Sequence, residues 1–196
     1  MKRTIEALAA ASIAVGLIGF LPQKAMADDR IFTVVTGDWN QDGTADAAML
    51  RLPDDDAPDH TLVLYLADRV TRRLRLTATA DNFVWGWPDT AGQSPRLEAM
   101  ANGSLAVHSQ NEAIGRNRWA QKLTVAYRNG TFVVAGFTYA AYDTLSQNPD
   151  EDALECDLNI LTGEGLLDGE PLRFSTTWIP LDAWTQEFGL KVCRVI

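Results

Sequence analysis

Oxygen-bearing side chains recur at fixed spacing in one short polar stretch, Gly37 to Asp46, which reads Gly-Asp-Trp-Asn-Gln-Asp-Gly-Thr-Ala-Asp. Counted from Asp38, the side chains of Asp38, Asn40, Asp42 and Asp46 occupy positions one, three, five and nine. Oxygen ligands at these offsets in a tight loop suit a hard, multiply coordinated cation such as Ca²⁺. The sequence therefore predicts a structural calcium site as the one place where residue types and spacing specify a chemistry.

Two further positions of the loop agree with this chemistry, and one rules out the commonest calcium motif. Gly43 stands at position six, where calcium loops turn sharply, and the backbone carbonyl of Thr44 at position seven would supply another oxygen. A helix-loop-helix EF-hand needs an acidic residue at position twelve, which here is Met49. The flanking residues 31–35 and 47–52 also have the composition of strands, so the EF-hand is rejected.

The stretch from Val34 to Leu52 resembles the strand-flanked calcium loop of FG-GAP and VCBS repeats. This resemblance implies the metal ligands Asp38, Asn40, Asp42, Thr44 and Asp46. No second copy of the pattern follows, and a propeller needs at least about four blades, so the repeat architecture is not expected. The alternative interpretation of the loop is a polar hairpin turn, for which Asp, Asn and Gly are favoured in any case. Residues 104–163 are also similar to secreted bacterial proteins of uncharacterised activity.

Residues 1–27 have the form of an export signal. Lys2 and Arg3 precede an apolar run, Leu8 to Leu21, and Ala25-Met26-Ala27 gives a small-x-small cleavage pattern. The apolar run is short for a membrane span, and no longer one follows. We expect a periplasmic or secreted bacterial protein with no membrane insertion after signal cleavage.

The charge of the chain limits its partners. The leader holds three of the 17 basic and one of the 26 acidic residues, which leaves 14 basic and 25 acidic residues and a formal net charge of −11. Nucleic acids and anionic membrane surfaces both attract basic patches, so the acidic balance argues against both as partners. The expected partner is an unidentified protein or glycan.

Short apolar runs between turn residues predict a single all-β domain over residues 28–196, built as an antiparallel sandwich or partly open barrel. The Gly/Ser/Pro-rich residues 89–95 mark a possible internal boundary. Residues 74–80 alternate leucine and alanine with arginine and threonine, which predicts a strand with one buried and one wet face. Helical spacing of apolar residues over 180–188 predicts a short C-terminal helix that ends at Gly189.

Two local signals are more specific. Asn129-Gly130 predicts a two-residue type I′ hairpin turn, which in steady register would pair Arg128 with Thr131 and Leu123 with Gly136. The two cysteines, Cys156 and Cys193, form an even pair in a chain expected to be exported, so they predict a disulfide.

Other polar groups leave alternatives open. The acidic loop over residues 53–60 is either a second cation patch or a solvated connector that carries His60, and the sequence favours the connector. Asp157 and Asn159 could hold a second ion, but hydrogen-bonding roles are favoured because the loop glycine is missing. The acidic side chains of the possible patch are Asp54, Asp55, Asp56 and Asp59.

Three functions follow from these features. The favoured one is an exported, non-enzymatic β-domain with one structural calcium loop, acting as a binding or envelope-associated module with no assigned catalytic residue. The first alternative is a periplasmic hydrolase of glycan or peptide, with His108, Glu112 and Arg118 gathered in a cleft for acid-base work. The second is a glycan-binding module that uses Trp85 and Trp87 as a stacking platform.

Overall fold

The computed structural model describes residues 30–52, 57–148 and 152–196 of the 196-residue chain. The expected leader lies outside these residues, as do Asp54, Asp55 and Asp56 of the acidic loop. Two antiparallel sheets and a short C-terminal helix make up the described part, which confirms the predicted all-β class. The sheets do not close into a barrel.

The first sheet is a four-stranded meander in which each strand pairs with its neighbour in sequence. Its strands are β1 (Ile31–Gly37), β2 (Asp46–Arg51), β3 (Asp59–Ala67) and β4 (Leu74–Trp85). Alternation along β2 and β3 places Leu50, Leu62 and Leu64 on the buried side, where they are fully inaccessible to solvent.

The second sheet is a seven-stranded meander, again in sequence order. Its strands are β5 (Arg96–Ala99), β6 (Leu105–Asn111), β7 (Asn117–Arg128), β8 (Thr131–Asp143), β9 (Leu154–Asn159), β10 (Glu164–Leu167) and β11 (Glu170–Arg173). Residues 89–95, the possible boundary, lie in the connection that leads from the first sheet to the second.

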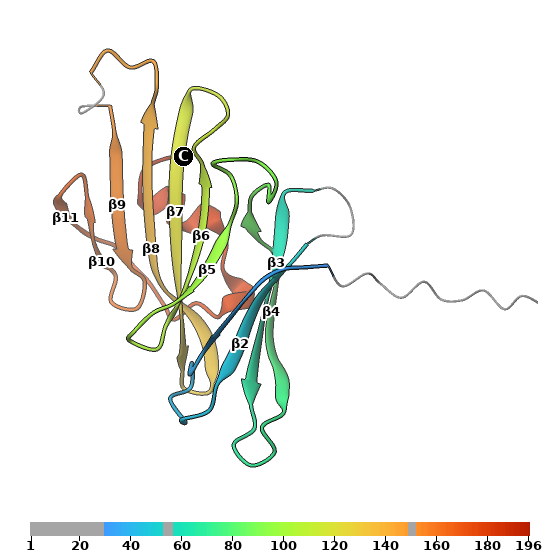
Figure 1. The fold of residues 1–196 in the computed structure, drawn as a ribbon. Helices are drawn as coiled ribbons and strands as arrows, with labels where there is room; N and C mark the ends of the chain where they lie inside the picture. The colour runs from blue at the N-terminus through green and yellow to red at the C-terminus, as the bar shows by residue number, and fades with distance from the viewer. Residues whose placement is uncertain (1–29, 53–56, 149–151) are drawn as a thin grey trace, which may run out of the picture.

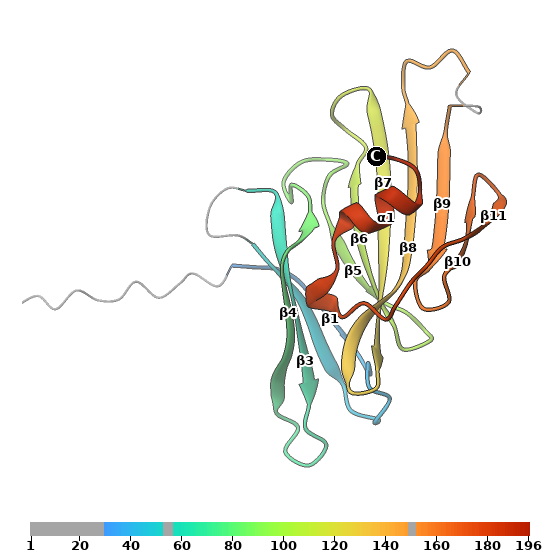
Figure 2. The ribbon, with the colours of Figure 1, turned by 180° about the vertical axis from the view of Figure 1, so that it is seen from behind.

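Both sheets contribute to one hydrophobic core. Leu50 and Leu62 of the first sheet belong to the same buried cluster as Leu123, Val125 and Phe137 of the second. The larger sheet extends past the smaller one, and the C-terminal helix covers part of the face that remains (Figures 1 and 2). The two sheets thus pack on each other through one shared core.

The β7–β8 hairpin confirms the turn signal and corrects its register. Asn129 and Gly130 both have positive φ, at 51° and 85°, as a type I′ turn requires, and Arg128 pairs with Thr131. A register shift between Thr124 and Val125 then pairs Gly136 with Thr124, so the predicted pairing of Leu123 with Gly136 is wrong. One extra residue in β8 forms a bulge, which lies too far from the turn to be specified by it.

A similar irregularity corrects the predicted faces of β4. Leu64 pairs with Ala78, but the next residue, Tyr65, pairs with Leu76, so one extra residue of β4 lies between these pairs. The extra residue inverts the alternation, because a shift of one position moves every later side chain to the other face. Leu74 and Leu76 are 49% and 60% exposed, and Arg73, Arg75 and Thr77 are exposed as well, so the start of β4 has no buried face, whereas Ala80 is buried.

The C-terminal helical region also differs from the expectation in its limits. A 3-10 turn, η1 (Leu181–Ala183), precedes α1 (Gln186–Val192), so Gly189 lies inside the helix instead of ending it. A Cβ at Gly189 would approach the ring of Phe137 to 2.8 Å. The glycine therefore permits close contact between helix and sheet rather than a C-terminal cap.

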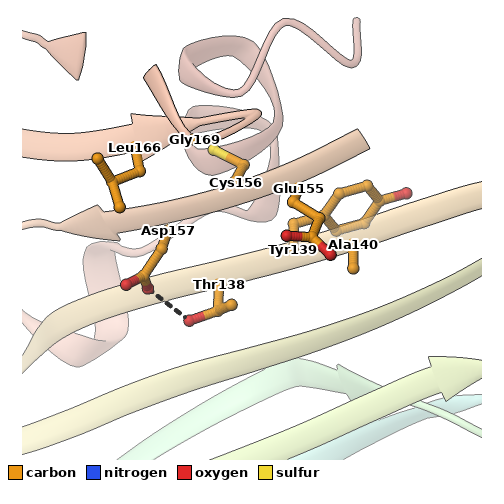
Figure 3. A pocket seen from close by; sticks show the side chains of 8 residues that line it. All are labelled: Thr138, Tyr139, Ala140, Glu155, Cys156, Asp157, Leu166 and Gly169. Carbon is orange, nitrogen blue, oxygen red and sulfur yellow. Dashed lines mark hydrogen bonds between the residues drawn. The ribbon is translucent and has the colours of Figure 1, made fainter. Parts of the chain in front are cut away.

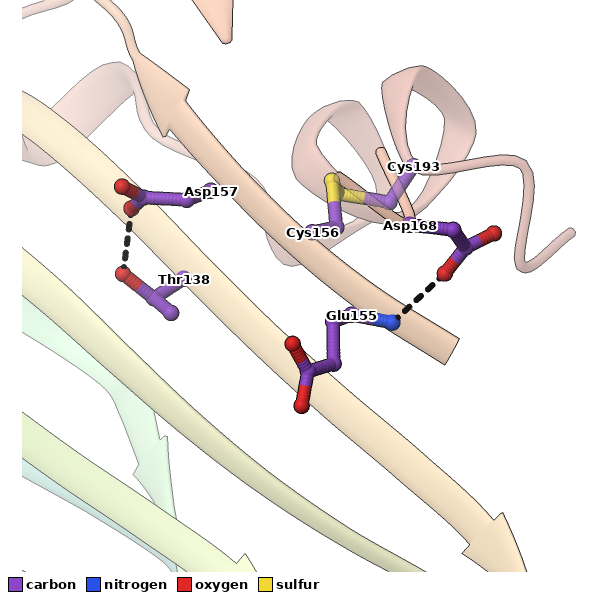
Figure 4. Close-up of a disulfide and its surroundings, with 6 residues drawn as sticks. All are labelled: Thr138, Glu155, Cys156, Asp157, Asp168 and Cys193. Carbon is purple, nitrogen blue, oxygen red and sulfur yellow. Dashed lines mark hydrogen bonds between the residues drawn. A yellow bond between two sulfur atoms is a disulfide. The ribbon is translucent and has the colours of Figure 1, made fainter. Parts of the chain in front are cut away.

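The predicted disulfide is confirmed. Cys156 of β9 is bonded to Cys193, the residue that follows α1, with 5.7 Å between their Cα atoms (Figure 4). Both half-cystines are buried. The bond fixes the end of the chain to the centre of the larger sheet.

Candidate metal site

The Gly37–Asp46 loop connects β1 to β2, and its two end residues face each other as the last pair of that ladder. The flanking strands confirm the strand-loop-strand setting that argued against an EF-hand. All three acidic side chains of this loop accept hydrogen bonds from its own backbone N–H groups. The loop conformation is thus determined by the residues that the sequence singled out.

Asp38 holds the turn at the far side of the loop. Its Oδ1 accepts a hydrogen bond from the backbone N–H of Asp42 at 2.9 Å, and its Oδ2 accepts one from Gly43 at 2.8 Å. Gly43 has φ of +82° with nothing within 4 Å of a built Cβ, so the requirement for glycine is conformational. This is the turn that position six of a calcium loop demands.

Asn40 and Asp42 complete the polar side of the loop. The side-chain oxygen of Asn40 accepts from the N–H of Asp42 at 3.1 Å, and Asp42 accepts from the N–H of Thr44 at 2.8 Å. Asn40 also donates to the second carboxylate oxygen of Asp42 at 3.2 Å. Burial would raise the pKa of Asp42, but hydrogen bonds from Thr44 and Asn40 and the charge of Arg69 outweigh it and lower that pKa.

Asp46 is the buried member of the set. It is fully inaccessible to solvent, and its two oxygens accept hydrogen bonds from the N–H groups of Trp39 at 2.9 Å and Ala67 at 2.8 Å. Burial raises the pKa of this carboxyl, and the negative charge of Asp42 raises it further, against three backbone hydrogen bonds that lower it. A buried carboxylate that is repelled by a second one is electrostatically unfavourable unless a positive charge balances both.

Trp39 anchors the loop, a role that the sequence reasoning missed. Its side chain is 2% exposed and belongs to the core cluster that joins the two sheets. The indole folds back over Gly37, where an added Cβ would lie 2.3 Å from the ring. A large apolar residue at position two of an otherwise polar loop is the signal that could have revealed this anchor.

Two other turns meet the loop. Arg72, in the β3–β4 turn, donates from Nη1 to the hydroxyl of Thr44 at 3.3 Å. Gly103, in the β5–β6 turn, lies so close that an added Cβ would be 3.0 Å from the side-chain nitrogen of Gln41. The loop therefore lies where a turn of the first sheet and a turn of the second come together.

The donor set fits a hard cation, although its carboxylates are not gathered around one point. Each carboxylate oxygen of Asp38 accepts one N–H and has a second lone pair, whereas Asp46 already accepts from the backbone of Trp39, Asn40 and Ala67. In the described part of the chain, no group of three or more His, Cys, Asp or Glu side chains is close enough together to hold a metal ion. Asn40 and the Thr44 carbonyl are oxygen donors of other types. Calcium binding would thus require the carboxylate side chains to rotate toward the ion while the backbone conformation of the loop stays the same.

The other candidate ion ligands make hydrogen bonds instead. Asp157 accepts from the hydroxyl of Thr138 at 2.8 Å beside a hollow of about 340 Å³ on the larger sheet (Figure 3). Asn159 accepts from the N–H groups of Leu161 and Thr162. Asp59, the described acid of the possible second patch, lies in β3. The hydrogen-bonding interpretation of Asp157 and Asn159 is therefore confirmed.

The residues of the hydrolase alternative come together only in part. Glu112 follows the Asn111–Trp119 pair of the β6–β7 ladder and so lies beside Arg118, whereas His108 lies apart from both. His108 contacts Glu98 at 3.2 Å and Arg96 at 3.2 Å, on the strands β6 and β5. Glu112 instead accepts a hydrogen bond from Tyr142 at 2.9 Å. His108 pairs with Lys122 across the β6–β7 ladder, which places it four residues, or about 13 Å along the strand, from the level of Arg118.

His60 corrects the assignment of residues 53–60 as one exposed connector. It lies in β3, fully buried, next to the ring of Phe32 with 6.0 Å between ring centroids. Among the described residues, neither ring nitrogen has a hydrogen-bond partner. Burial lowers the pKa of His60, partly offset by the charge of Asp59. His60 is a core residue. Its burial was not predicted because the prolines and aspartates that precede it are typical of an exposed loop.

The tryptophans of the glycan-binding alternative do not form a joint platform. Trp85 contacts Trp119 with 5.2 Å between centroids and an interplanar angle of 53°. Trp119 in turn stacks on Tyr139, which stacks on Phe137 of the core. Trp87 is 37% exposed, and no ring contact joins it to Trp85 within the described residues. The geometry assigns Trp85 to the core margin.

Two observations on the whole chain complete the setting of the site. Of the helices in the described ranges, none is long and apolar enough to cross a membrane. The chain was also compared with models of known protein families, with curated proteins and with solved structures, and none of these comparisons finds a match.

Proposed function

We propose that this chain is an exported, non-enzymatic β-sandwich protein whose Gly37–Asp46 loop binds one calcium ion for structural purposes. The proposed ligands are the side chains of Asp38, Asn40, Asp42 and Asp46 with the carbonyl of Thr44. The resemblance to FG-GAP and VCBS loops belongs to this proposal. The ion would supply positive charge only, since no reaction is assigned to it.

The observation that carries the proposal is the burial of Asp46. Its carboxylate is inaccessible to solvent, burial raises its pKa, and the charge of Asp42 raises that pKa further. A divalent cation between the carboxylates would turn this repulsion into attraction. The Gly43 turn and the oxygen character of every proposed ligand agree with calcium among the biological cations.

The position of the loop indicates what the ion would do. The loop contacts the β3–β4 turn through Arg72 and the β5–β6 turn through Gly103, and it sends Trp39 into the shared core. Calcium bound there would stiffen the meeting point of the two sheets, because each ligand is tied to a different segment of the loop. A rigid sandwich in an exported protein suits a binding or envelope-associated module.

Export itself is supported by the disulfide between Cys156 and Cys193. Structural disulfides form and persist in oxidising compartments such as the bacterial periplasm or the exterior. The leader pattern in residues 1–27 agrees with this compartment. The hydrolase and glycan-binding alternatives have less support, because His108 lies apart from Glu112 and Arg118 and because Trp85 contacts Trp119 instead of Trp87.

Thermal unfolding in calcium and in chelator tests the proposal. We expect calcium to raise the melting temperature of the exported protein, since a ligand at 100 times its dissociation constant adds about 2.7 kcal/mol. Asp42→Ala should abolish the shift, whereas the exposed control Asp182→Ala should retain it. An unchanged melting temperature of the wild-type protein in chelator would contradict the proposal.

A further inference from the structure

The turn between β3 and β4 projects from the end of the first sheet (Figure 1). Residues 69–77, which form the turn and the start of β4, are all exposed. The turn is closed tightly, because the N–H of Asp68 donates to the carbonyl of Arg73 and the N–H of Arg72 donates to that of Asp68. The projection is therefore a defined hairpin tip and not a loose loop.

The tip concentrates positive charge in an acidic protein. Four arginines lie within seven residues, and they are four of the 14 basic residues that follow the leader: Arg69, Arg72, Arg73 and Arg75. Within the described ranges none of the four makes an ion pair, although six such pairs occur elsewhere. Their positive charges face solvent uncompensated by any salt bridge.

Apolar side chains alternate with these arginines. Val70 at the tip is 90% exposed, and Leu74 and Leu76, in the part of β4 where both faces are exposed, are 49% and 60% exposed. Exposed aliphatic groups next to unpaired cations have no evident role in the stability of this fold. Together, Val70, the two leucines and the four arginines form a surface that we call the Arg-Leu tip.

Two of the arginines interact electrostatically with nearby acids, Arg69 with Asp42 and Arg75 with Asp68, but neither forms an ion pair within the described ranges. Asp68 is occupied by the turn itself, since its carboxylate accepts from the N–H groups of Val70 and Thr71. Arg72 donates one hydrogen bond to Thr44, and its partner there is a hydroxyl and not a carboxylate. The metal loop therefore orients Arg72 and lies near Arg69, while the guanidinium groups of all four arginines stay exposed and outside any salt bridge of the described residues.

We propose that the Arg-Leu tip docks on an anionic phospholipid surface. Guanidinium groups bind lipid phosphates. Aliphatic side chains contribute binding free energy only where they can enter a hydrocarbon region as well. A soluble polyanion provides the phosphate or carboxylate but no hydrocarbon for Val70. A projecting hairpin also suits a deformable lipid interface better than it suits a pocket on a partner protein.

Local charge prevails over the charge of the whole chain at this site. The formal net charge of −11 argues against attraction of the protein as a whole, but exposed charges separated by more than about 8 Å are largely screened at physiological salt. The proposal rests on the envelope-associated role proposed above and names its partner surface. Docking of the tip does not require calcium at the Gly37–Asp46 loop. A failure of lipid binding can therefore be distinguished from a failure of calcium binding.

Vesicle sedimentation tests the inference. The exported protein is mixed with vesicles of phosphatidylcholine, with or without phosphatidylglycerol, in both calcium and chelator, while circular dichroism monitors folding. We expect binding that requires phosphatidylglycerol and weakens with salt. Each arginine contributes about fivefold to affinity near an anionic surface, so Arg69→Gln with Arg73→Gln should weaken binding roughly 30-fold.

A second pair of substitutions is the matched control. Arg173→Gln with Lys191→Gln removes the same two charges from β11 and α1 and should leave binding unchanged. Val70→Ser should weaken binding about tenfold if the valine enters the hydrocarbon region. An absence of binding in every folded sample would overturn the proposal.

Two further outcomes would overturn it in favour of another partner. Binding to soluble polyphosphate as strong as to vesicles, together with no effect of Val70→Ser, would assign the tip to a polyanion. Binding that needs calcium and ignores the arginines would show that calcium bridges lipid to the acidic surface.

Discussion

The Gly37–Asp46 loop and the Cys156–Cys193 bond each fasten one part of the chain to a sheet, and they do so by different interactions. The bond ties the residue after α1 to β9, with both half-cystines buried. The loop ties β1 and β2 to Ala67 and to the core through the hydrogen bonds of Asp46 and the side chain of Trp39.

The disulfide and the metal loop, the two closures of the chain, differ in the electric charge that each leaves unbalanced. A disulfide is neutral and complete once formed, whereas the loop buries the carboxylate of Asp46 beside the charge of Asp42. The covalent closure should therefore act equally in all ionic conditions. The polar closure should depend on cations, which provides the means of separating them.

Removing the disulfide should have the largest effect. Cys156→Ala with Cys193→Ala frees a loop of 37 residues, for which chain entropy gives about 4 kcal/mol of lost stability. Urea unfolding would measure the loss. The calcium-dependent rise in melting temperature should persist in this variant, and its disappearance would show that the two closures are not independent.

Replacing Asp46 should have the next largest effect. Asp46→Ala leaves the N–H groups of Trp39 and Ala67 without acceptors in a buried place, at a cost of about 2 kcal/mol even in chelator. Asp42→Ala should change stability in chelator less, because Asp42 is only half-buried and accepts a single backbone N–H, that of Thr44, whereas Asp46 is fully buried. Urea unfolding in chelator measures the loss of stability in each variant. Equal losses would contradict the distinction between Asp46 as a fully buried ligand and Asp42 as a half-buried one.

The smallest expected effect concerns pH and the first sheet. Burial holds the pKa of His60 below its ordinary value of 6.5, so the unfolded chain takes up the proton first as pH falls. The free energy of unfolding should therefore be highest above about pH 6.5 and decrease as pH falls toward the folded pKa.

Chemical denaturation between about pH 7 and pH 5 checks this effect. His60→Leu should flatten the pH profile and leave the calcium shift intact. His108→Gln serves as the control, because burial also lowers the pKa of His108, yet this side chain is partly exposed and bonded to Glu98. If only His108→Gln flattened the profile, the core role of His60 would be wrong.

Features set by adjacent residues could be predicted from the sequence. Asn129 and Gly130 have the positive φ values of their turn, and Cys156 and Cys193 are bonded. Gly43 adopts the positive φ that a calcium loop requires. In each case the cause is local conformation or the chemistry of a unique pair, both of which are visible in the chain itself.

Features set by contacts between distant segments could not be predicted. The bulges in β4 and β8 are features of the pairing between strands, and Leu74 and Leu76 are exposed where β4 has no buried face. Gly189 is placed by the ring of Phe137 and not by the end of a helix. The burial of His60 likewise depends on strand pairing rather than on neighbouring residues.

Calcium titration by isothermal titration calorimetry tests the central claim most directly, because it measures binding apart from stability. We expect saturable binding of one ion per chain to the exported protein, lost in Asp42→Ala and retained in Asp182→Ala and in the variant without the disulfide. No saturable heat in the folded wild-type protein, or unchanged binding in Asp42→Ala, would contradict the assignment of the Gly37–Asp46 loop as a calcium site.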